Sequence, residues 1–297
     1  MQDTIKLVIL PLYRIENEYS FSVFDNLDFS QNTLSLEWLE SNISHLFSKF
    51  NVDKISIEGG EISLLSDIYF DLLFRLLNIY NKKISITTDF IKFNRSLINN
   101  ADVINVLYNF NHRSEVVFSN IKAAISTGKV INIKSLDVFI QDNPLDKITT
   151  LNKLKIKAWK IIPYQKTKSQ VGIVNDSTYT ETIEKYLKHS NYMQFSFQNK
   201  LELEGIINNN NFPINTVYIT PNSKFGLGKI DDFGYFYIEE FEDINELEKN
   251  LKKAQSQQIL LCEGCKYQSN CLADRYFNKE YLTKTTCSGY KDLIKNK

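Results

Sequence analysis

The first 261 residues contain no cysteine, although the chain has 297 residues and four cysteines in all. Histidine is also scarce, because His45, His112 and His189 are the only three and form no HxH or HExxH arrangement. No P-loop, catalytic triad or nucleophile elbow is present. These absences exclude the common histidine metal sites and nucleophile motifs, and each histidine is expected to be a surface or helix residue.

Net charge and long apolar runs are absent as well. Lys+Arg and Asp+Glu both number 35, so the formal net charge is +0. A nucleic-acid or polyanion binder usually carries a basic excess, so that class is not favoured. No apolar segment approaches the ~20 residues that span a bilayer, and residues 1–14 lack the basic region and cleavage site of a signal peptide. We therefore expect a cytoplasmic protein without nucleic-acid or membrane partners.

Strand and helix patterns alternate in six steps between residue 4 and about residue 163. Apolar strand-like segments precede segments with apolar residues at helical spacing. Ser35 is expected to cap one helix and Gly128 to end another. This alternation predicts an α/β fold with parallel strands joined by right-handed crossovers. A six-strand partial barrel fits better than a doubly wound sheet, although periodicity alone does not separate them. Beyond residue 163 we expect a helix, a pair of β-hairpins over 215–241 and a polar helix.

The segment 54–65, KISIEGGEISLL, places Gly59, Gly60 and Glu61 where the second expected strand ends. In both candidate architectures the carboxyl ends of parallel strands carry the site. Two glycines allow close approach of the backbone, and Glu61 adds one negative charge. This strand end is therefore a candidate site for a positively charged or amine-bearing group. Asp89, near the end of the third strand, is supported by position alone.

All four cysteines lie in the last 36 residues, with the spacing Cys262-x2-Cys265-x5-Cys271-x15-Cys287. Such clustering argues for metal or cluster ligation over disulfides. A CxxC turn places two thiolates on one face of a metal, and a third and a fourth complete a tetrahedral set. Four thiolates suit either a [4Fe–4S] cluster or Zn²⁺, and the spacing leaves both open.

The cysteine tail resembles the C-terminal SPASM domain of radical SAM enzymes that mature ribosomally made peptides. That family carries a Cx2Cx5Cx3C run followed by one more cysteine. Cys262, Cys265 and Cys271 match the first three positions, Cys287 matches the last, and Arg275 stands at the fourth. In the family, that fourth cysteine serves the other auxiliary cluster, whose upstream cysteine pair is also missing here. The resemblance therefore implies one [4Fe–4S] cluster, with zinc as the alternative.

The glycine pair and Glu61 resemble the GGE motif on the second strand of radical SAM barrels, which holds the amino group of S-adenosylmethionine. The family also places a CxxxCxxC motif in the loop after the first strand. The corresponding loop here has no cysteine, and its best register puts Ile15, Tyr19 and Ser22 at those positions. No cluster could then deliver the electron that cleaves the sulfonium. The resemblance thus implies a vestigial S-adenosylmethionine site and no radical chemistry.

The resemblance covers nearly the whole chain. It implies a partial (β/α)6 radical SAM-like barrel over residues 1–195 and a SPASM-like domain over residues 196–297. The expected role is to bind a precursor peptide, or a partner maturase such as an ATP-grasp ligase, during maturation of a ribosomally synthesised peptide. Two alternatives stay open. One is an enzyme that uses the remaining iron–sulfur cluster or the old barrel pocket for new chemistry, and the other is a structural zinc-binding protein.

Overall fold

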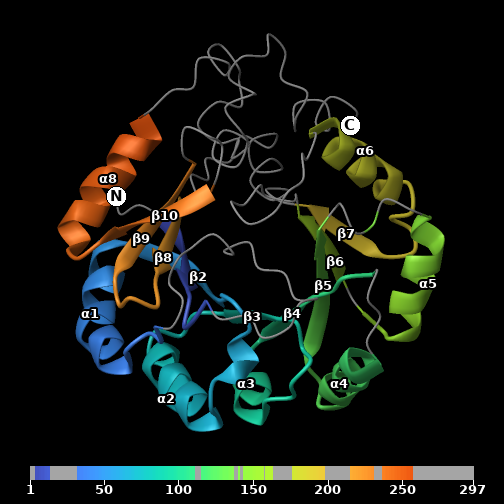
Figure 1. The fold of residues 1–297 in the computed structure, drawn as a ribbon, viewed down its shortest axis with the longest axis horizontal. Helices are drawn as coiled ribbons and strands as arrows, with labels where there is room; N and C mark the ends of the chain where they lie inside the picture. Colours follow the sequence, from blue (N-terminus) through green and yellow to red (C-terminus); the bar gives the residue numbers. More distant parts are fainter. Residues whose placement is uncertain are drawn as a thin grey trace.

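The computed structural model describes residues 4–13, 32–110, 115–136, 140, 143–156, 158–162, 176–197, 215–230 and 236–256. The strands in these ranges form one ten-stranded sheet with the order β10-β9-β8-β1-β2-β3-β4-β5-β6-β7. Figure 1 shows that this sheet curves into an open ring and that the helices lie on its outside. Among the described helices, none is both long and apolar enough to cross a membrane.

The first part of the chain alternates strands and helices, as the sequence predicts. Neighbouring strands from β1 to β6 are all parallel. The six predicted strand–helix steps are therefore confirmed. The elements are β1 (Thr4–Ile9), α1 (Leu36–Lys49), β2 (Asn51–Ile57), the short 3-10 helix η1 (Ile62–Leu64), α2 (Asp67–Asn78), β3 (Ile84–Thr88), α3 (Arg95–Asn100), β4 (Val103–Leu107), α4 (Glu115–Ser126), β5 (Val130–Leu136), α5 (Pro144–Lys153), β6 (Ala158–Ile162) and α6 (Asp176–Leu187).

The second part of the chain extends the same sheet at both ends. Strand β7 (Gln194–Phe197) pairs with β6 in parallel, and the sequence did not predict it because QFSF is short and half polar. Strand β8 (Asn215–Ile219) runs parallel to β1, and β9 (Phe225–Ile230) and β10 (Phe236–Phe241) follow as the predicted antiparallel hairpins. The helix α8 (Ile244–Ser256) comes next. The proposed division after residue 195 falls inside β7, and the two-domain organisation stays a prediction.

Side chains at the helix ends explain where several helices begin and stop. The Ser35 hydroxyl accepts a hydrogen bond from the Trp38 N–H at the start of α1, which confirms the predicted cap. Asn143 caps α5, and Pro144 occupies its first turn. Gly128 follows α4 with φ +82°, a left-handed conformation that glycine adopts without strain, as predicted.

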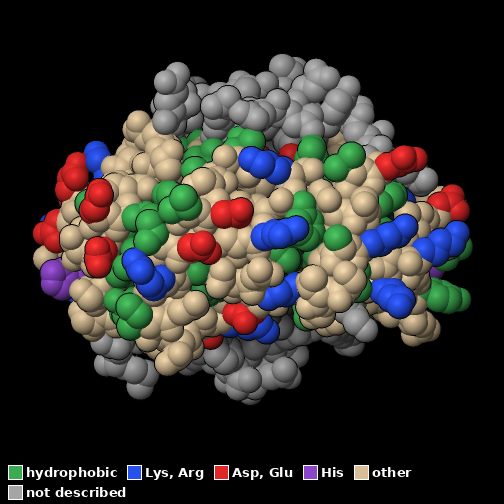
Figure 2. Space-filling view, turned by 90° about the horizontal axis from the view of Figure 1, so that it is seen from below, with side chains coloured by type: hydrophobic (Ala, Val, Ile, Leu, Met, Phe, Trp, Pro, Cys, Tyr) green, Lys and Arg blue, Asp and Glu red, His purple; other side chains and the backbone are tan. Residues whose placement is uncertain are grey.

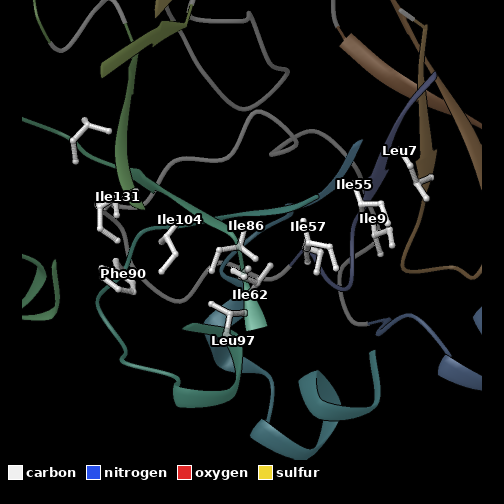
Figure 3. Close-up of a cluster of buried hydrophobic side chains, with 14 of the residues drawn as sticks. Leu7, Ile9, Ile55, Ile57, Ile62, Ile86, Phe90, Leu97, Ile104 and Ile131 are labelled. Carbon is white, nitrogen blue, oxygen red and sulfur yellow. The ribbon is translucent and has the colours of Figure 1, made fainter. Parts of the chain in front are cut away.

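The core lies between the outer face of the sheet and the helices. Successive strand residues point to opposite faces, and in β1 to β5 the outward set is mostly apolar, with Thr88 and Ser135 as buried polar exceptions. Figure 3 shows part of this cluster, with residues from the strands, η1, α3 and the turn after β3 in contact. Its labelled members are Leu7, Ile9, Ile55, Ile57, Ile62, Ile86, Phe90, Leu97, Ile104 and Ile131. The intervening strand residues consequently face the inside of the ring.

Candidate functional site

The structure places Gly59, Gly60 and Glu61 directly after β2, at the carboxyl edge of the parallel strands. Gly59 has φ +144°, and a Cβ atom there would collide with the carbonyl oxygen of Leu12, in the segment that follows β1. The Gly60 N–H donates to the same carbonyl oxygen at 3.0 Å. The glycine pair therefore joins the chain segments that leave β1 and β2, which explains why two residues without side chains stand there.

The side chain of Glu61 points into the protein, and Glu61 is only 5% exposed. One oxygen accepts from the Ser63 N–H at 2.9 Å and from the Thr88 hydroxyl at 2.6 Å, and the other accepts from the Asp89 N–H at 2.7 Å. Glu61 thereby caps η1 and ties it to the end of β3. Both carboxylate oxygens are occupied by donors of the protein itself.

Glu61 lies against Asp89, whose N–H donates to it. Burial raises the pKa of Glu61 most, and the negative charge of Asp89 and a hydrogen bond with the Asp89 carboxyl raise it further, to about 8. Hydrogen bonds from Ser63 and Thr88 oppose this rise. Glu61 consequently retains its proton at neutral pH. The assignment of Gly59, Gly60 and Glu61 to an amine of S-adenosylmethionine stays a prediction.

A second charged group, missed from the sequence, faces the inside of the ring next to the glycine pair. Glu58 follows β2, and its Oε1 lies 3.5 Å from Nζ of Lys6 on β1 and 3.5 Å from Nζ of Lys134 on β5. The Ser56 hydroxyl also donates to it. Lys134 further donates to the Thr87 hydroxyl on β3 at 2.7 Å. The side chain of Lys134 on β5 passes β4 to reach Thr87 on β3 and Glu58 after β2. It can do so only across the concave face of the sheet, so this charged group lies inside the ring.

The surroundings of Glu58 keep it ionised. Burial alone would raise the pKa of Glu58, but the charges of Lys134 and Lys6 and the Ser56 hydrogen bond hold it far below its usual value. Burial lowers the pKa of Lys134, and Glu58 partly restores it. The sequence did carry a signal for this group, since a lysine adjoins apolar residues in TIKLVI, DKISI, NIKSL and AWKII. Lysines inside strands of a buried sheet need a partner or a ligand.

Neutral polar side chains cover more of the inner face between these charges. The hydroxyls of Ser56 and Ser85 lie 3.1 Å apart, and the Asn132 amide nitrogen donates to the Asn105 oxygen at 3.4 Å. Asn105 in turn donates to the Ile86 carbonyl at 3.1 Å. These side chains make the inner face polar between the charged groups.

The predicted metal ligands Cys262, Cys265, Cys271 and Cys287 lie outside the described residues, as does the loop over 14–31 that lacks the CxxxCxxC motif. Within the ranges that the structure describes, no group of three or more His, Cys, Asp or Glu side chains could hold a metal ion. The four-thiolate site, and its choice between iron–sulfur and zinc, stay predictions.

Comparison with known proteins identifies the architecture. No protein-family model and no curated protein matches the chain. Among solved structures, native anSMEcpe with bound AdoMet and Cp18Cys peptide aligns over 99% of this chain and 98% of that chain, with a TM-score of 0.62 and 16% identity. The chain has a radical SAM-like fold. This result confirms the predicted α/β partial barrel, whereas the SPASM-like domain stays a prediction.

The SuiB protein of Streptococcus suis is also similar in structure. SuiB bound to S-adenosylmethionine aligns over 75% of this chain with a TM-score of 0.58 and 14% identity. SuiB bound to precursor peptide SuiA aligns over 76% of it with a TM-score of 0.54 and 16% identity. This chain covers only 60% and 59% of those two SuiB chains. At these sequence identities the structural similarity establishes the fold but not the function.

Proposed function

We propose that this chain binds the precursor of a ribosomally synthesised peptide during its maturation and does not itself generate a radical. The similarity to anSMEcpe over almost the full length of both chains carries this proposal, because that structure holds a peptide. The SuiB structure with precursor peptide SuiA supports the same class of ligand. The polar inner face of the barrel is the surface on which we expect the peptide to bind.

The non-radical part of the proposal rests on the ligands that are missing from the sequence. No cysteine occurs before Cys262, so the segment after β1 offers no thiolate for a cluster next to the strand ends. The environment of Glu61 agrees with this view, since its two oxygens already accept three hydrogen bonds from the protein. Because a carboxylate has about four acceptor sites, at most one site on Glu61 is left for an ammonium group. We therefore derive no step through S-adenosylmethionine and treat Gly59, Gly60 and Glu61 as a vestigial site.

The four cysteines of the tail can supply the donor atoms of one metal centre. Four thiolates, from Cys262, Cys265, Cys271 and Cys287, match the requirement of a [4Fe–4S] cluster and equally that of Zn²⁺. We favour the [4Fe–4S] cluster because of the resemblance to the SPASM pattern. Metal analysis of protein purified without oxygen separates the two, with about four irons and matching sulfide for a cluster or one zinc for a structural site.

A direct binding measurement tests the proposed function. The full chain is titrated with the precursor peptide encoded beside its gene, and with a scrambled version of that peptide as control. We expect saturable binding of the precursor peptide but not of its scrambled version. The chain binds the precursor either alone or together with a neighbouring maturase such as an ATP-grasp ligase. Equal binding of both peptides, or binding of neither with and without that partner, would overturn the proposal.

One observation favours the alternative of new chemistry in the barrel. Glu58 and Lys134 are paired titratable groups with displaced pKa values on the inner face, as catalytic acids and bases often are. This alternative predicts turnover of the bound peptide that disappears in Lys134→Met, even at peptide concentrations that saturate the variant. Binding without any change in the mass or the stereochemistry of the peptide would leave the binding role as the function.

A further inference from the structure

Helix α2 is apolar on the side that faces away from the sheet as well as on the side that packs against it. Its inner side contributes four residues to the core, Phe70, Leu73, Phe74 and Leu77. On the opposite side, Ile68 and Leu72 are 72% and 38% exposed, and Ile79 at the end of the helix is 71% exposed. Positions four and seven apart lie on one face of a helix, so these three side chains form a line. We call them the apolar stripe. A helix that is apolar all round is normally buried, which makes an exposed stripe unusual.

Exposed apolar side chains concentrate around this helix. Among the residues that the structure describes, ten large hydrophobic side chains are exposed, and five of them lie within residues 68–93. Besides the apolar stripe these are Ile91 and Phe93, on the loop between β3 and α3. That loop adjoins the start of α2, because the Asn94 amide donates to the Leu65 carbonyl at 3.2 Å. Figure 2 views this side of the molecule and shows hydrophobic side chains at the surface between charged ones. A concentration of this kind marks an interaction surface.

Two opposite charges lie along one flank of the apolar stripe. Asp71 and Arg75 are both exposed and stand one helical turn apart. A two-fold axis that pairs two copies of α2 in opposite directions keeps this flank on the same side of both helices. It also reverses the order of the residues, so that Asp71 of each copy lies opposite the partner's Arg75. Parallel pairing would instead place like charges opposite each other. The charges of α2 therefore complement those of a second, antiparallel copy.

We propose that α2 of one copy packs antiparallel against α2 of a second copy across a two-fold axis, so that the chain forms a homodimer through its outer face. The apolar stripes of the two copies contact each other at the centre, and two reciprocal ion pairs between Asp71 and Arg75 fix the direction. A two-fold interface of this type uses the same surface of both subunits, which a single self-complementary helix provides.

The dimer goes beyond the proposed function and does not depend on it. Helix α2 lies on the outside of the ring, so the pairing leaves the inner face free. One helix and one loop from each copy make a small contact, below the ~1,200 Å² of most stable interfaces. We therefore expect a reversible dimer with a dissociation constant on the order of 10 µM.

Sedimentation of the full chain tests the dimer, at concentrations from about 1 to about 200 µM that bracket this constant. Leu72→Glu, at the centre of the apolar stripe, should raise the dissociation constant at least about tenfold. Because Leu72 is exposed, the melting temperature of this variant should stay within a few degrees of the natural chain. The matched control is Leu145→Glu on α5, which changes a 45% exposed leucine outside the surface and should leave the dimer intact.

Charge reversal tests whether the occupant is a second copy. Arg75→Glu and Asp71→Lys should each weaken the dimer about tenfold, because each places like charges opposite each other in both pairs. An equimolar mixture of the two variants should restore association, since opposite charges then meet in both pairs. Asp71 also accepts a hydrogen bond from the Ser96 hydroxyl, so circular dichroism checks the fold of Asp71→Lys. If that variant unfolds, Leu72→Glu and Arg75→Glu carry the test.

Several outcomes would overturn the proposal. A chain that stays monomeric over the whole concentration range has no such interface. A dimer that persists in Leu72→Glu uses another surface, and an equal loss in Leu145→Glu shows unspecific association. Two folded charge variants that associate no better together than alone would exclude the antiparallel pairing. A monomer that binds a neighbouring maturase through Leu72 would make that enzyme the occupant of the surface and exclude the second copy.

Discussion

Replacement of Glu61 by alanine is the sharpest test of the strand-end geometry. The carboxylate of Glu61 accepts from two backbone N–H groups, those of Ser63 and Asp89, and from the Thr88 hydroxyl. In Glu61→Ala these three donors lose their acceptor in a buried place. A buried donor without a partner costs about 1–3 kcal/mol. Removal of the buried carboxyl group beside Asp89, and entry of water, offset part of this sum. We expect a net loss of about 2–5 kcal/mol in the free energy of unfolding.

Urea unfolding measures this loss, and hydrogen exchange localises it. The amides of Ser63 and Asp89 should exchange slowly in the natural chain and much faster in Glu61→Ala. Glu61→Gln keeps an oxygen for Ser63 and Thr88 but not for the Asp89 N–H, so we expect a smaller loss of about 1–2 kcal/mol at neutral pH. Glu40→Ala, at an exposed position on α1, is the matched control and should stay within about 0.5 kcal/mol of the natural chain. A Glu61→Ala variant as stable as this control would refute the reasoning.

Three further predictions follow from the same residues. Gly59→Ala should destabilise the chain by about 2 kcal/mol or more in urea unfolding, because its Cβ meets the Leu12 carbonyl and its φ is +144°; no loss would contradict this contact. Because the pKa of Glu61 is raised to about 8 from 4.5, the folded state holds the extra proton in this range, and stability should fall as pH rises from about 5 to 8. That fall, on the order of 1 kcal/mol or more, should be absent in Glu61→Gln. Glu58→Gln should lower the free energy of unfolding by about 2–4 kcal/mol at pH 7, because Lys6 and Lys134 lose the carboxylate they share. Unchanged stability would show that other groups balance the charges of these two lysines.

Local patterns were enough to predict most elements of the barrel. Alternating apolar segments, the cap at Ser35 and the stop at Gly128 are properties of short stretches, and the structure confirms them. The position of Gly59, Gly60 and Glu61 at a strand end follows from the same patterns. Strand β7 was missed because four residues with two polar side chains carry too little periodicity.

Contacts between distant segments could not be predicted in the same way. The pairing of β8 with β1 joins residues about two hundred positions apart, and nothing in either strand specifies its partner. The reason for the glycine pair is the Leu12 carbonyl, which belongs to another loop. The donors around Glu61 come from η1 and from the end of β3. Likewise, Lys6 on β1 and Lys134 on β5 reach the same carboxylate of Glu58 only because the sheet curves.

We propose that this radical SAM-like fold holds a peptide without cleaving S-adenosylmethionine. The most direct test reconstitutes the full chain with iron and sulfide under anaerobic conditions, adds its precursor peptide, S-adenosylmethionine and a strong reductant, and measures 5′-deoxyadenosine. We expect the peptide to stay bound and unchanged, with no 5′-deoxyadenosine above the level of a protein-free control. Repeated formation of 5′-deoxyadenosine by the chain would contradict the proposed non-radical role.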